Sequence, residues 1–137
     1  MNRIEIINGA NLNLLGQREK DIYGERDFLT FLEELRKKYP QVMIDYFQSN
    51  VEGELVNELQ ESKADAIIIN AGGYTHTSVV LRDAISSIET PVVEVHISNI
   101  FAREEFRHHS LIAPACKGSI IGFGLKSYEI ALNYFLL

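Results

Sequence analysis

Four short apolar runs in the sequence have the character of strands that are buried in a parallel sheet. They consist mainly of Ile, Val and Ala with little polar alternation, as in strands that are covered on both faces. A fifth run, Val42–Phe47, alternates more between apolar and polar residues and is predicted to lie at a sheet edge. The four continuous runs are Ile4–Ile7, Ala66–Ile69, Val92–Val95 and Ser119–Phe123.

Helical spacing separates these runs. Apolar residues from Phe28 to Tyr39 follow the i, i+3, i+4, i+7 spacing of one helix face, and Pro40 is expected to end that helix. A short helical turn is predicted within FAREEFRHH. Further helices are predicted around Leu55–Leu59, Leu81–Ile88 and Leu125–Phe135.

The alternation of strands and helices predicts an α/β fold in which helices cover both faces of a parallel sheet. Five strands in 137 residues favour a flavodoxin-like three-layer fold with strand order 2-1-3-4-5, an order that periodicity alone does not fix. The chain has no internal repeat or linker, so we expect a single domain over residues 1–137. In such sheets ligands bind beyond the carboxyl ends of the strands.

The charge and the cysteine content narrow the possible functions. A count of 13 Lys and Arg residues against 19 Asp and Glu residues leaves a net charge of −6, which argues against general nucleic-acid binding. The single Cys116, expected to be a small buried residue, excludes a disulfide framework or a thiolate metal cluster within one chain. No apolar run approaches the roughly 20 residues of a membrane span, and Asn8 interrupts the apolar start where a signal peptide would continue. We therefore expect a cytoplasmic protein with neither a nucleic-acid nor a membrane partner.

Dense polar segments follow the predicted strands, and two of these segments contain histidine. His76 follows the third strand and His96 the fourth. Either residue alone could be a core histidine whose hydrogen bonds are satisfied, but two at adjacent strand ends favour an active site. His108 and His109 lie in a charged tract and are interpreted as surface or interface residues. Because adjacent histidines do not match the i, i+4 spacing of a zinc helix, no metal site is predicted.

The residue types at these strand ends favour proton transfer or elimination. The sequence has no P-loop, no dinucleotide-binding glycine motif after the first strand and no serine nucleophile elbow. Arg18, Arg103 and Arg107 lie near the strand ends of an acidic chain and suggest an anionic ligand such as a carboxylate. Tyr23 could be a general base if its pKa fell by about three units, which requires roughly 4 kcal/mol of stabilisation, or it could simply anchor its loop. The pair Gly72-Gly73 fits turn geometry better than a phosphate cradle.

Four segments of the chain resemble, in order and spacing, the signature blocks of type II 3-dehydroquinate dehydratase. They are NGANLNLLGQREKDIYG, FQSNVEG, NAGGYTHTSVVLRDA and EVHISNIFAREEFRHHS, and the resemblance runs from Asn8 to about Gly124. It implies a flavodoxin-like fold and a homododecamer built as a tetramer of trimers. It also implies the trans-dehydration of 3-dehydroquinate to 3-dehydroshikimate, a step of the shikimate pathway toward chorismate and the aromatic amino acids, without a cofactor, a metal or a covalent imine.

By position, the resemblance also implies which groups react. Tyr23 matches a tyrosine base that removes the proton next to the ketone and gives an enolate. Arg18 matches an arginine, in a lid loop at about residues 17–25, that lowers the pKa of that tyrosine. His96 matches the general acid that protonates the departing hydroxyl.

The same resemblance implies how the substrate is held. Ile97 and Ser98 match the pair that holds the substrate carboxylate, partly through backbone N–H groups. Asp83 matches a residue that reaches a neighbouring subunit's site. Asn11 is expected to help hold the enolate oxygen or its water. The residues expected to hold the substrate hydroxyls are Asn70, His76 and Arg107.

Two departures from the family pattern and one alternative function complete the sequence picture. The family pattern has proline where this chain has Ala10 and Lys20, which changes the expected stiffness of the lid loop but no catalytic position. The alternative is a non-catalytic flavodoxin-like binding or signalling module. Such a module would need an acidic cluster or a hydroxyl-rich phosphate loop after the first strand, where the sequence instead reads NGANLN.

Overall fold

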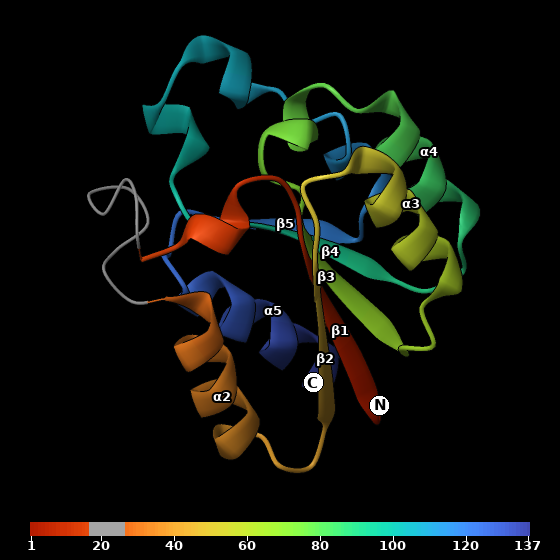
Figure 1. Ribbon diagram of the computed structural model, residues 1–137, viewed down its shortest axis with the longest axis vertical. Coiled ribbons are helices and arrows are strands. Elements are labelled where there is room, and N and C mark those ends of the chain that lie inside the picture. Colours follow the sequence, from red (N-terminus) through yellow and green to blue (C-terminus); the bar gives the residue numbers. More distant parts are fainter. Residues whose placement is uncertain (17–26) are drawn as a thin grey trace.

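Five parallel strands form the centre of the molecule, as the apolar runs predict. The computed structural model describes residues 1–16 and 27–137. The strands are β1 Arg3–Asn8, β2 Met43–Gln48, β3 Ala66–Asn70, β4 Val92–His96 and β5 Gly118–Ile121. Their order in the sheet is β2-β1-β3-β4-β5 (Figure 1), which confirms the predicted flavodoxin-like topology and the edge position of the second strand.

Helices cover both faces of this sheet. Those in the described residues are α2 Phe28–Lys38, α3 Glu52–Glu61, α4 Val79–Ser87 and α5 Lys126–Leu136. Helices α2 and α5 lie on one face and α3 and α4 on the other (Figure 1). The Asp27 side chain caps α2 by accepting a hydrogen bond from the Thr30 N–H at 2.9 Å. Helix α2 ends one residue before its predicted end, because Tyr39 precedes Pro40 and leaves the helical conformation.

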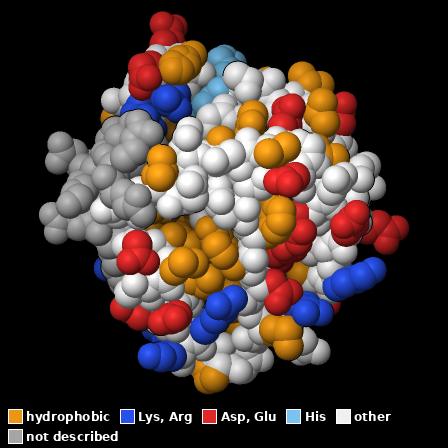
Figure 2. Space-filling model, in the orientation of Figure 1, with side chains coloured by type: hydrophobic (Ala, Val, Ile, Leu, Met, Phe, Trp, Pro, Cys, Tyr) orange, Lys and Arg blue, Asp and Glu red, His pale blue; other side chains and the backbone are white. Residues whose placement is uncertain are grey.

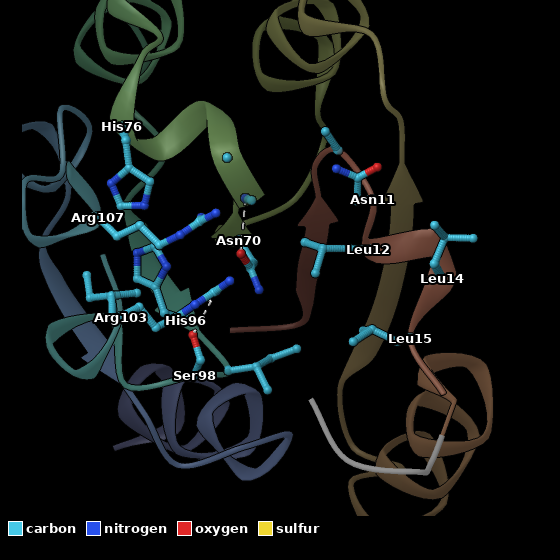
Figure 3. A pocket seen from close by; sticks show the side chains of 15 residues that line it. Asn11, Leu12, Leu14, Leu15, Asn70, His76, His96, Ser98, Arg103 and Arg107 are labelled. Atoms are coloured by element: carbon cyan, nitrogen blue, oxygen red, sulfur yellow. Dashed lines mark hydrogen bonds between the residues drawn. The ribbon is translucent and has the colours of Figure 1, made fainter. Parts of the chain in front are cut away.

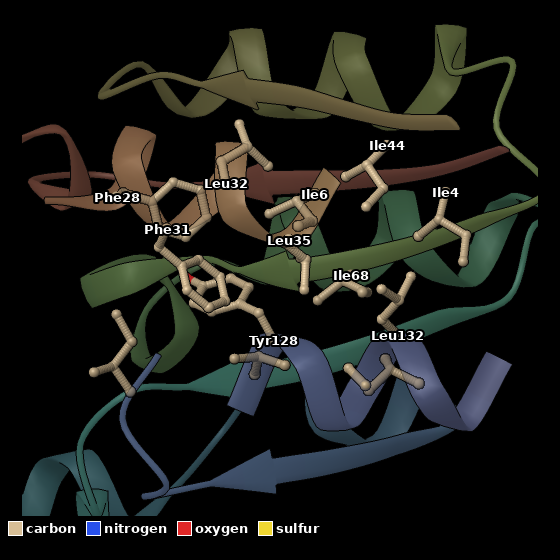
Figure 4. Packing of buried hydrophobic residues seen from close by; sticks show 14 of the residues in the cluster. Ile4, Ile6, Phe28, Phe31, Leu32, Leu35, Ile44, Ile68, Tyr128 and Leu132 are labelled. Atoms are coloured by element: carbon tan, nitrogen blue, oxygen red, sulfur yellow. The ribbon is translucent and has the colours of Figure 1, made fainter. Parts of the chain in front are cut away.

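Alternate residues along the strands divide the core into two layers. Ile4 and Ile6 belong to the layer under α2 and α5, and Ile7 belongs to the layer under α3 and α4. Tyr128 of α5 has no exposed surface, and its ring centroid lies 4.9 Å from that of Phe28 (Figure 4). Because both faces of the sheet are packed in this way, the carboxyl ends of the strands are held in fixed relative positions.

The fifth strand is shorter than the sequence predicts, and it ends at Ile121 instead of Phe123. Gly122 has a φ of +94°, which is outside the strand conformation, and a Cβ added to it would lie 3.1 Å from the Asn99 Cβ. Phe123 is consequently 64% exposed. Here a glycine that turns the chain outweighs the hydrophobic pattern, and the prediction of a strand through Phe123 is wrong.

Short 3-10 helices occupy the segments that follow the strands. One of them, Glu105–His108, confirms the helical turn predicted within residues 101–109, and Gly72 begins another, which confirms the interpretation of that glycine as a turn residue. Cys116 is only partly buried, although the sequence suggested a buried thiol. His108 and His109 are exposed, as predicted. The 3-10 helices are η1 Leu12–Leu14, η2 Gly72–His76, η3 Ile100–Ala102, η4 Glu105–His108 and η5 Ala113–Ala115.

The described helices can be compared with the requirements for a membrane-spanning helix. In residues 1–16 and 27–137, no helix combines the length and the apolar character that crossing a membrane requires.

Candidate active site

A cavity of about 160 Å³ lies at the carboxyl ends of β1, β3 and β4 (Figure 3). Asp83 lies elsewhere, exposed on α4. Arg18 and Tyr23 fall outside the described residues. The sheet therefore brings together most of the side chains that the sequence singled out. The predicted site residues that line the cavity are Asn11, Asn70, His76, His96, Ile97, Ser98 and Arg107.

Two close backbone contacts bring the segments after β1 and β3 together. A Cβ on Gly9 would lie 2.3 Å from the Ala71 carbonyl oxygen, and a Cβ on Gly72 would lie 2.7 Å from the Ala10 carbonyl oxygen. Only glycine fits at either position, and Gly72 in addition has a φ of +63°. Asn11 then adopts the left-handed conformation, at a φ of 71°, and its side chain lines the cavity.

The side-chain amide of Asn70 is held by a chain of hydrogen bonds. Its Oδ1 accepts a hydrogen bond from the Gly72 N–H at 3.1 Å. This contact shows which terminal atom of the amide is the oxygen, so the other is the NH₂ nitrogen. That NH₂ group donates to Tyr128 Oη at 2.9 Å, and Tyr128 donates in turn to Asn8 Oδ1 at 2.7 Å. One N–H of Asn70 remains for a ligand, so the ligand atom that it meets must be an acceptor.

Replacing Tyr128 by phenylalanine is expected to loosen this chain. The change removes the hydroxyl that serves both Asn70 and Asn8, and each buried polar group left without its partner costs about 1–3 kcal/mol. We expect a lower midpoint of urea unfolding at fixed protein concentration, together with weaker ligand binding. The matched control is Tyr134→Phe, which alters a ring that is 50% exposed on the same helix and should leave both quantities unchanged. An unchanged midpoint for Tyr128→Phe would contradict the supporting role.

His96 ends β4 and is paired with a buried carboxylate. Its Nε2 lies 2.8 Å from Glu94 Oε2, and the two residues are 5% and 0% exposed. The pair can form because residues two apart on a strand point to the same face of the sheet. The contact orients the imidazole ring and leaves Nδ1 as the ring nitrogen for a ligand in the cavity.

Glu94 carries a negative charge in this buried position. Burial raises the pKa of the Glu94 carboxyl, but hydrogen bonds from His96, Ser110 and Ser119 outweigh that effect and lower the pKa below its ordinary value. An ionised Glu94 can accept a hydrogen bond from the Nε2–H of His96. Our sequence reasoning did not select Glu94 as a site residue. The available signal was a single acidic residue within the apolar run Val92–Val95, two positions before His96.

His76 presents a neutral ring to the cavity. Its Nδ1 lies 2.7 Å from the His109 carbonyl oxygen, so Nδ1 carries the proton and donates it. Desolvation by burial lowers the pKa of His76, and the charges of His96 and Arg107 act in the same direction, against the hydrogen bond to His109. The unprotonated Nε2 is therefore an acceptor, which suits a hydroxyl of the ligand.

Two arginines make one side of the cavity positive (Figure 3). Arg107 Nε donates to Glu104 Oε1 at 3.2 Å, and its guanidinium lies 4.9 Å from the Phe106 ring centroid. Arg103 Nη1 donates to Ser98 Oγ at 3.4 Å. Figure 2 shows Lys or Arg side chains close to histidine side chains at the upper end of the molecule, toward which the strands run. Although the whole chain is acidic, this end can attract an anion.

Backbone donors lie in the same wall of the cavity. The N–H groups of Ile97 and Ser98 donate no hydrogen bond to any residue in the described ranges. Both residues line the cavity with Arg103 and Arg107. Free N–H groups beside guanidinium groups form a suitable binding site for a carboxylate.

The cavity as a whole supports acid–base chemistry on a small hydroxy-carboxylate. It combines a histidine with an ionised partner, an acceptor for a hydroxyl and donors for a carboxylate. Among residues 1–16 and 27–137, no three His, Cys, Asp or Glu side chains come close enough to hold a metal ion. The prediction that the reaction uses no metal stays a prediction.

Comparison with known protein sequences gives a family match over nearly the whole chain. A family model described as dehydroquinase class II matches residues 2–136. The 3-dehydroquinate dehydratase of Caldicellulosiruptor bescii is 53% identical over 137 residues, covering 96% of this chain and 94% of that protein. The 3-dehydroquinate dehydratase of Campylobacter jejuni is 52% identical over 134 residues, covering 95% of this chain and 84% of that protein.

Solved structures agree with the sequence matches. The type II dehydroquinase from Butyrivibrio crossotus has a TM-score of 0.93 and 42% identity, and the similarity covers 99% of this chain and 98% of that chain. The type II dehydroquinase from Propionibacterium acnes has a TM-score of 0.92 and 34% identity, covering 98% of this chain and 96% of that chain. These matches favour an enzyme over the binding or signalling module.

Proposed function

The chain belongs to the class II dehydroquinase family, and on that premise we propose that it catalyses the trans-dehydration of 3-dehydroquinate to 3-dehydroshikimate. This reaction would serve the shikimate pathway toward chorismate and the aromatic amino acids. The observation that supports it most directly is the pairing of His96 with Glu94 in a cavity that also offers donors for a carboxylate. Such a site can protonate a departing hydroxyl while it holds the rest of the substrate in place.

The proposed reaction separates removal of the proton from loss of the hydroxyl. Tyr23, as a phenolate, takes the proton next to the ketone, and the electron pair moves onto the ketone oxygen to give an enolate. When the enolate returns to a ketone, the C–O bond at the beta carbon breaks and His96 protonates the departing oxygen, which leaves as water. Tyr23 gains one proton and His96 loses one, so exchange with solvent restores both groups before the next turnover.

Three further residues support these two steps in the proposal. The charge of Glu94 favours the protonated ring of His96 before the transfer, and the contact fixes the orientation of that ring. Arg18 favours the phenolate form of Tyr23. Asn11 holds the enolate oxygen or a water molecule bound to it. No cofactor, metal or covalent imine takes part.

The binding roles follow from the hydrogen-bonding capacity of each group. Ile97 and Ser98 hold the substrate carboxylate through their backbone N–H groups. His76 accepts a hydrogen bond from a substrate hydroxyl at Nε2, and Asn70 donates its remaining N–H to a hydroxyl oxygen. Arg107 donates to a further hydroxyl from its place in the wall of the cavity.

An absorbance assay tests this function. Incubation of the intact protein with 3-dehydroquinate should raise ultraviolet absorbance, because the product is a conjugated enone-carboxylate. The absence of a rise with the assembled protein would refute the proposal. Treatment with borohydride in the presence of substrate should leave the protein active, and a trapped lysine adduct would contradict the route without an imine.

We also propose that the protein works in the cytoplasm as a homododecamer, a tetramer of trimers, with residues 1–137 of each chain forming one domain. The family match over residues 2–136 supports the single domain. The position of Asp83 supports shared sites, because the residue is exposed on α4 and does not line the cavity of its own chain. A residue in that position could reach the cavity of a neighbouring subunit.

Shared sites predict a particular behaviour of Asp83→Ala. We expect a higher KM for 3-dehydroquinate with a smaller change in kcat, because in the proposal the missing carboxylate helps to bind substrate in the cavity of the neighbouring subunit. The matched control is Glu89→Ala, which removes an exposed carboxylate shortly after α4 and should leave KM unchanged. The measurement pairs steady-state kinetics with the mass in solution by analytical ultracentrifugation. Full activity in a verified monomer would contradict sharing.

A further inference from the structure

The carboxylate of Glu94 has more partners than the histidine that it faces. Glu94 is completely buried in the sheet, and a buried carboxylate without enough donors is unfavourable. Two serine hydroxyls supply donors besides His96. Ser110 donates to Oε2, the same oxygen that His96 contacts, and Ser119 donates to Oε1. Both oxygens of the carboxylate are thus engaged.

The Ser110 hydroxyl is fixed in direction by a second contact. Its Oγ accepts a hydrogen bond from the Ala113 N–H at 3.0 Å, at the start of η5. Its own proton then points to Glu94 Oε2, at an Oγ–Oε2 distance of 2.5 Å. A hydroxyl held in this way offers a donor without any rearrangement, which is the condition for holding a charge steady during a reaction.

Ser119 approaches the carboxylate from the neighbouring strand. It lies on β5 in register with Glu94 on β4, so its hydroxyl meets the other oxygen of the carboxylate. Ser119 as a residue is exposed in the single chain, whereas Ser110 is partly buried. Water can therefore replace the hydroxyl of Ser119 more easily than that of Ser110.

We propose that Ser110, assisted by Ser119, is a positioning residue that keeps the Glu94 carboxylate ionised and turned toward His96. The part of this inference that concerns catalysis rests on the proposed function. The serines touch neither the substrate nor the reacting atoms, and they act only through Glu94.

Other titratable groups lie near the pair of His96 and Glu94 and are relevant to the charge of Glu94. The rings of His76 and His96 are stacked at an interplanar angle of 25° with centroids 6.3 Å apart, and Arg107 adds a positive charge nearby. Burial and the charge of Glu94 raise the pKa of the Cys116 thiol to about 12, so this thiol remains neutral. Apart from His96, the serines are the hydrogen-bond donors that Glu94 has among the described residues. Removal of either hydroxyl should therefore change the pKa of Glu94 itself.

Infrared titration of the unliganded protein tests the inference without any turnover. The signal is the carbonyl band of protonated Glu94, identified by its loss in Glu94→Gln. In Ser110→Ala we expect this band to appear at higher pH than in the unsubstituted protein, because the ionised form has lost a donor. Ser119→Ala should give a smaller shift in the same direction. Ser87→Ala removes a hydroxyl that bonds to the Ala84 carbonyl on α4 and should give none.

Kinetics then connect the carboxylate to catalysis. Ser110→Ala should lower kcat by roughly 10- to 100-fold, the range for a hydrogen bond to a charged group, with little change in KM. The acidic limb of the kcat profile should move to higher pH, and Ser110→Thr, which keeps the hydroxyl, should restore both.

The two measurements separate failure of the inference from failure of the proposed function. If Glu94 titrates in Ser110→Ala and in Ser119→Ala as it does in the unsubstituted protein, the inference is wrong, whatever the activity. If the titration shifts as expected but the unsubstituted protein does not dehydrate 3-dehydroquinate, the proposed function is wrong and the positioning of Glu94 stands.

Discussion

Replacement of His96 by alanine is expected to reduce kcat for 3-dehydroquinate by at least about 100-fold, the usual size of a general-acid contribution. Without the imidazole, the departing hydroxyl must take its proton from water in a cavity where Glu94 disfavours a second negative charge. Because the ring contributes to the proton transfer more than to binding, KM should change much less than kcat. Steady-state absorbance measurements over a range of pH would check both quantities.

Loss of His96 also removes a partner of a buried carboxylate, so a second variant separates chemistry from folding. His96→Asn keeps a side-chain N–H for Glu94 but cannot act as an acid at neutral pH. It should therefore fold like the unsubstituted protein, judged by its unfolding midpoint, and remain as inactive as His96→Ala. The control is His108→Ala, an exposed histidine outside the cavity, which should stay within about twofold of normal turnover. Near-normal turnover in His96→Asn would show that another group is the acid.

Tyr23→Phe is expected to have an effect of similar size, again at least about 100-fold in kcat. A free tyrosine has a pKa near 10, so only about one part in a thousand is a phenolate at pH 7. The proposed role requires positive charge near the hydroxyl, and Arg18 is the residue proposed to supply it. Removing the hydroxyl should abolish proton abstraction and leave substrate binding largely intact.

Isotope exchange makes the test of Tyr23 sharper than turnover alone. With substrate deuterated next to the ketone, Tyr23→Phe should retain the deuterium, whereas His96→Ala should still allow its slow exchange, because the proposed base remains. The matched control is Tyr134→Phe on α5, whose ring is 50% exposed and which should behave like the unsubstituted protein. Exchange at a normal rate in Tyr23→Phe would assign the base to another group.

The fold could be predicted from the sequence because its signals are local. The runs of Ile and Val gave the strands, and Pro40 marked the end of a helix to within one residue. The fifth strand was overestimated because Phe123 continues an apolar run, while Gly122 turns the chain with a positive φ at a place where Asn99, 23 positions earlier, leaves little room for a side chain. Hydrophobicity alone carries no information on such a contact.

The sequence predicted the site residues whose positions follow from the end of a strand. It did not predict the contacts that depend on a partner distant in the sequence. His76 and His96 stand at strand ends, so topology alone placed them in one cavity. Tyr128 supports Asn70 and bonds to Asn8, which is 120 positions away, and no local pattern reports that pairing. The carboxylate of Glu94 is similarly held by Ser110 and Ser119, which come later in the sequence, and no local pattern reports those contacts.

The paired glycines at the top of the sheet have a consequence for engineering. Gly9 and Gly72 let the segments after β1 and β3 approach each other closely, and Asn11 and Asn70, each two positions away from one of these glycines, both line the cavity. An alanine Cβ at either position would overlap a backbone carbonyl of the facing segment, so the two segments would have to separate, and Gly72 itself lines the cavity. When one of these loops is replaced by that of a homologue to change substrate preference, both glycines should therefore be retained together.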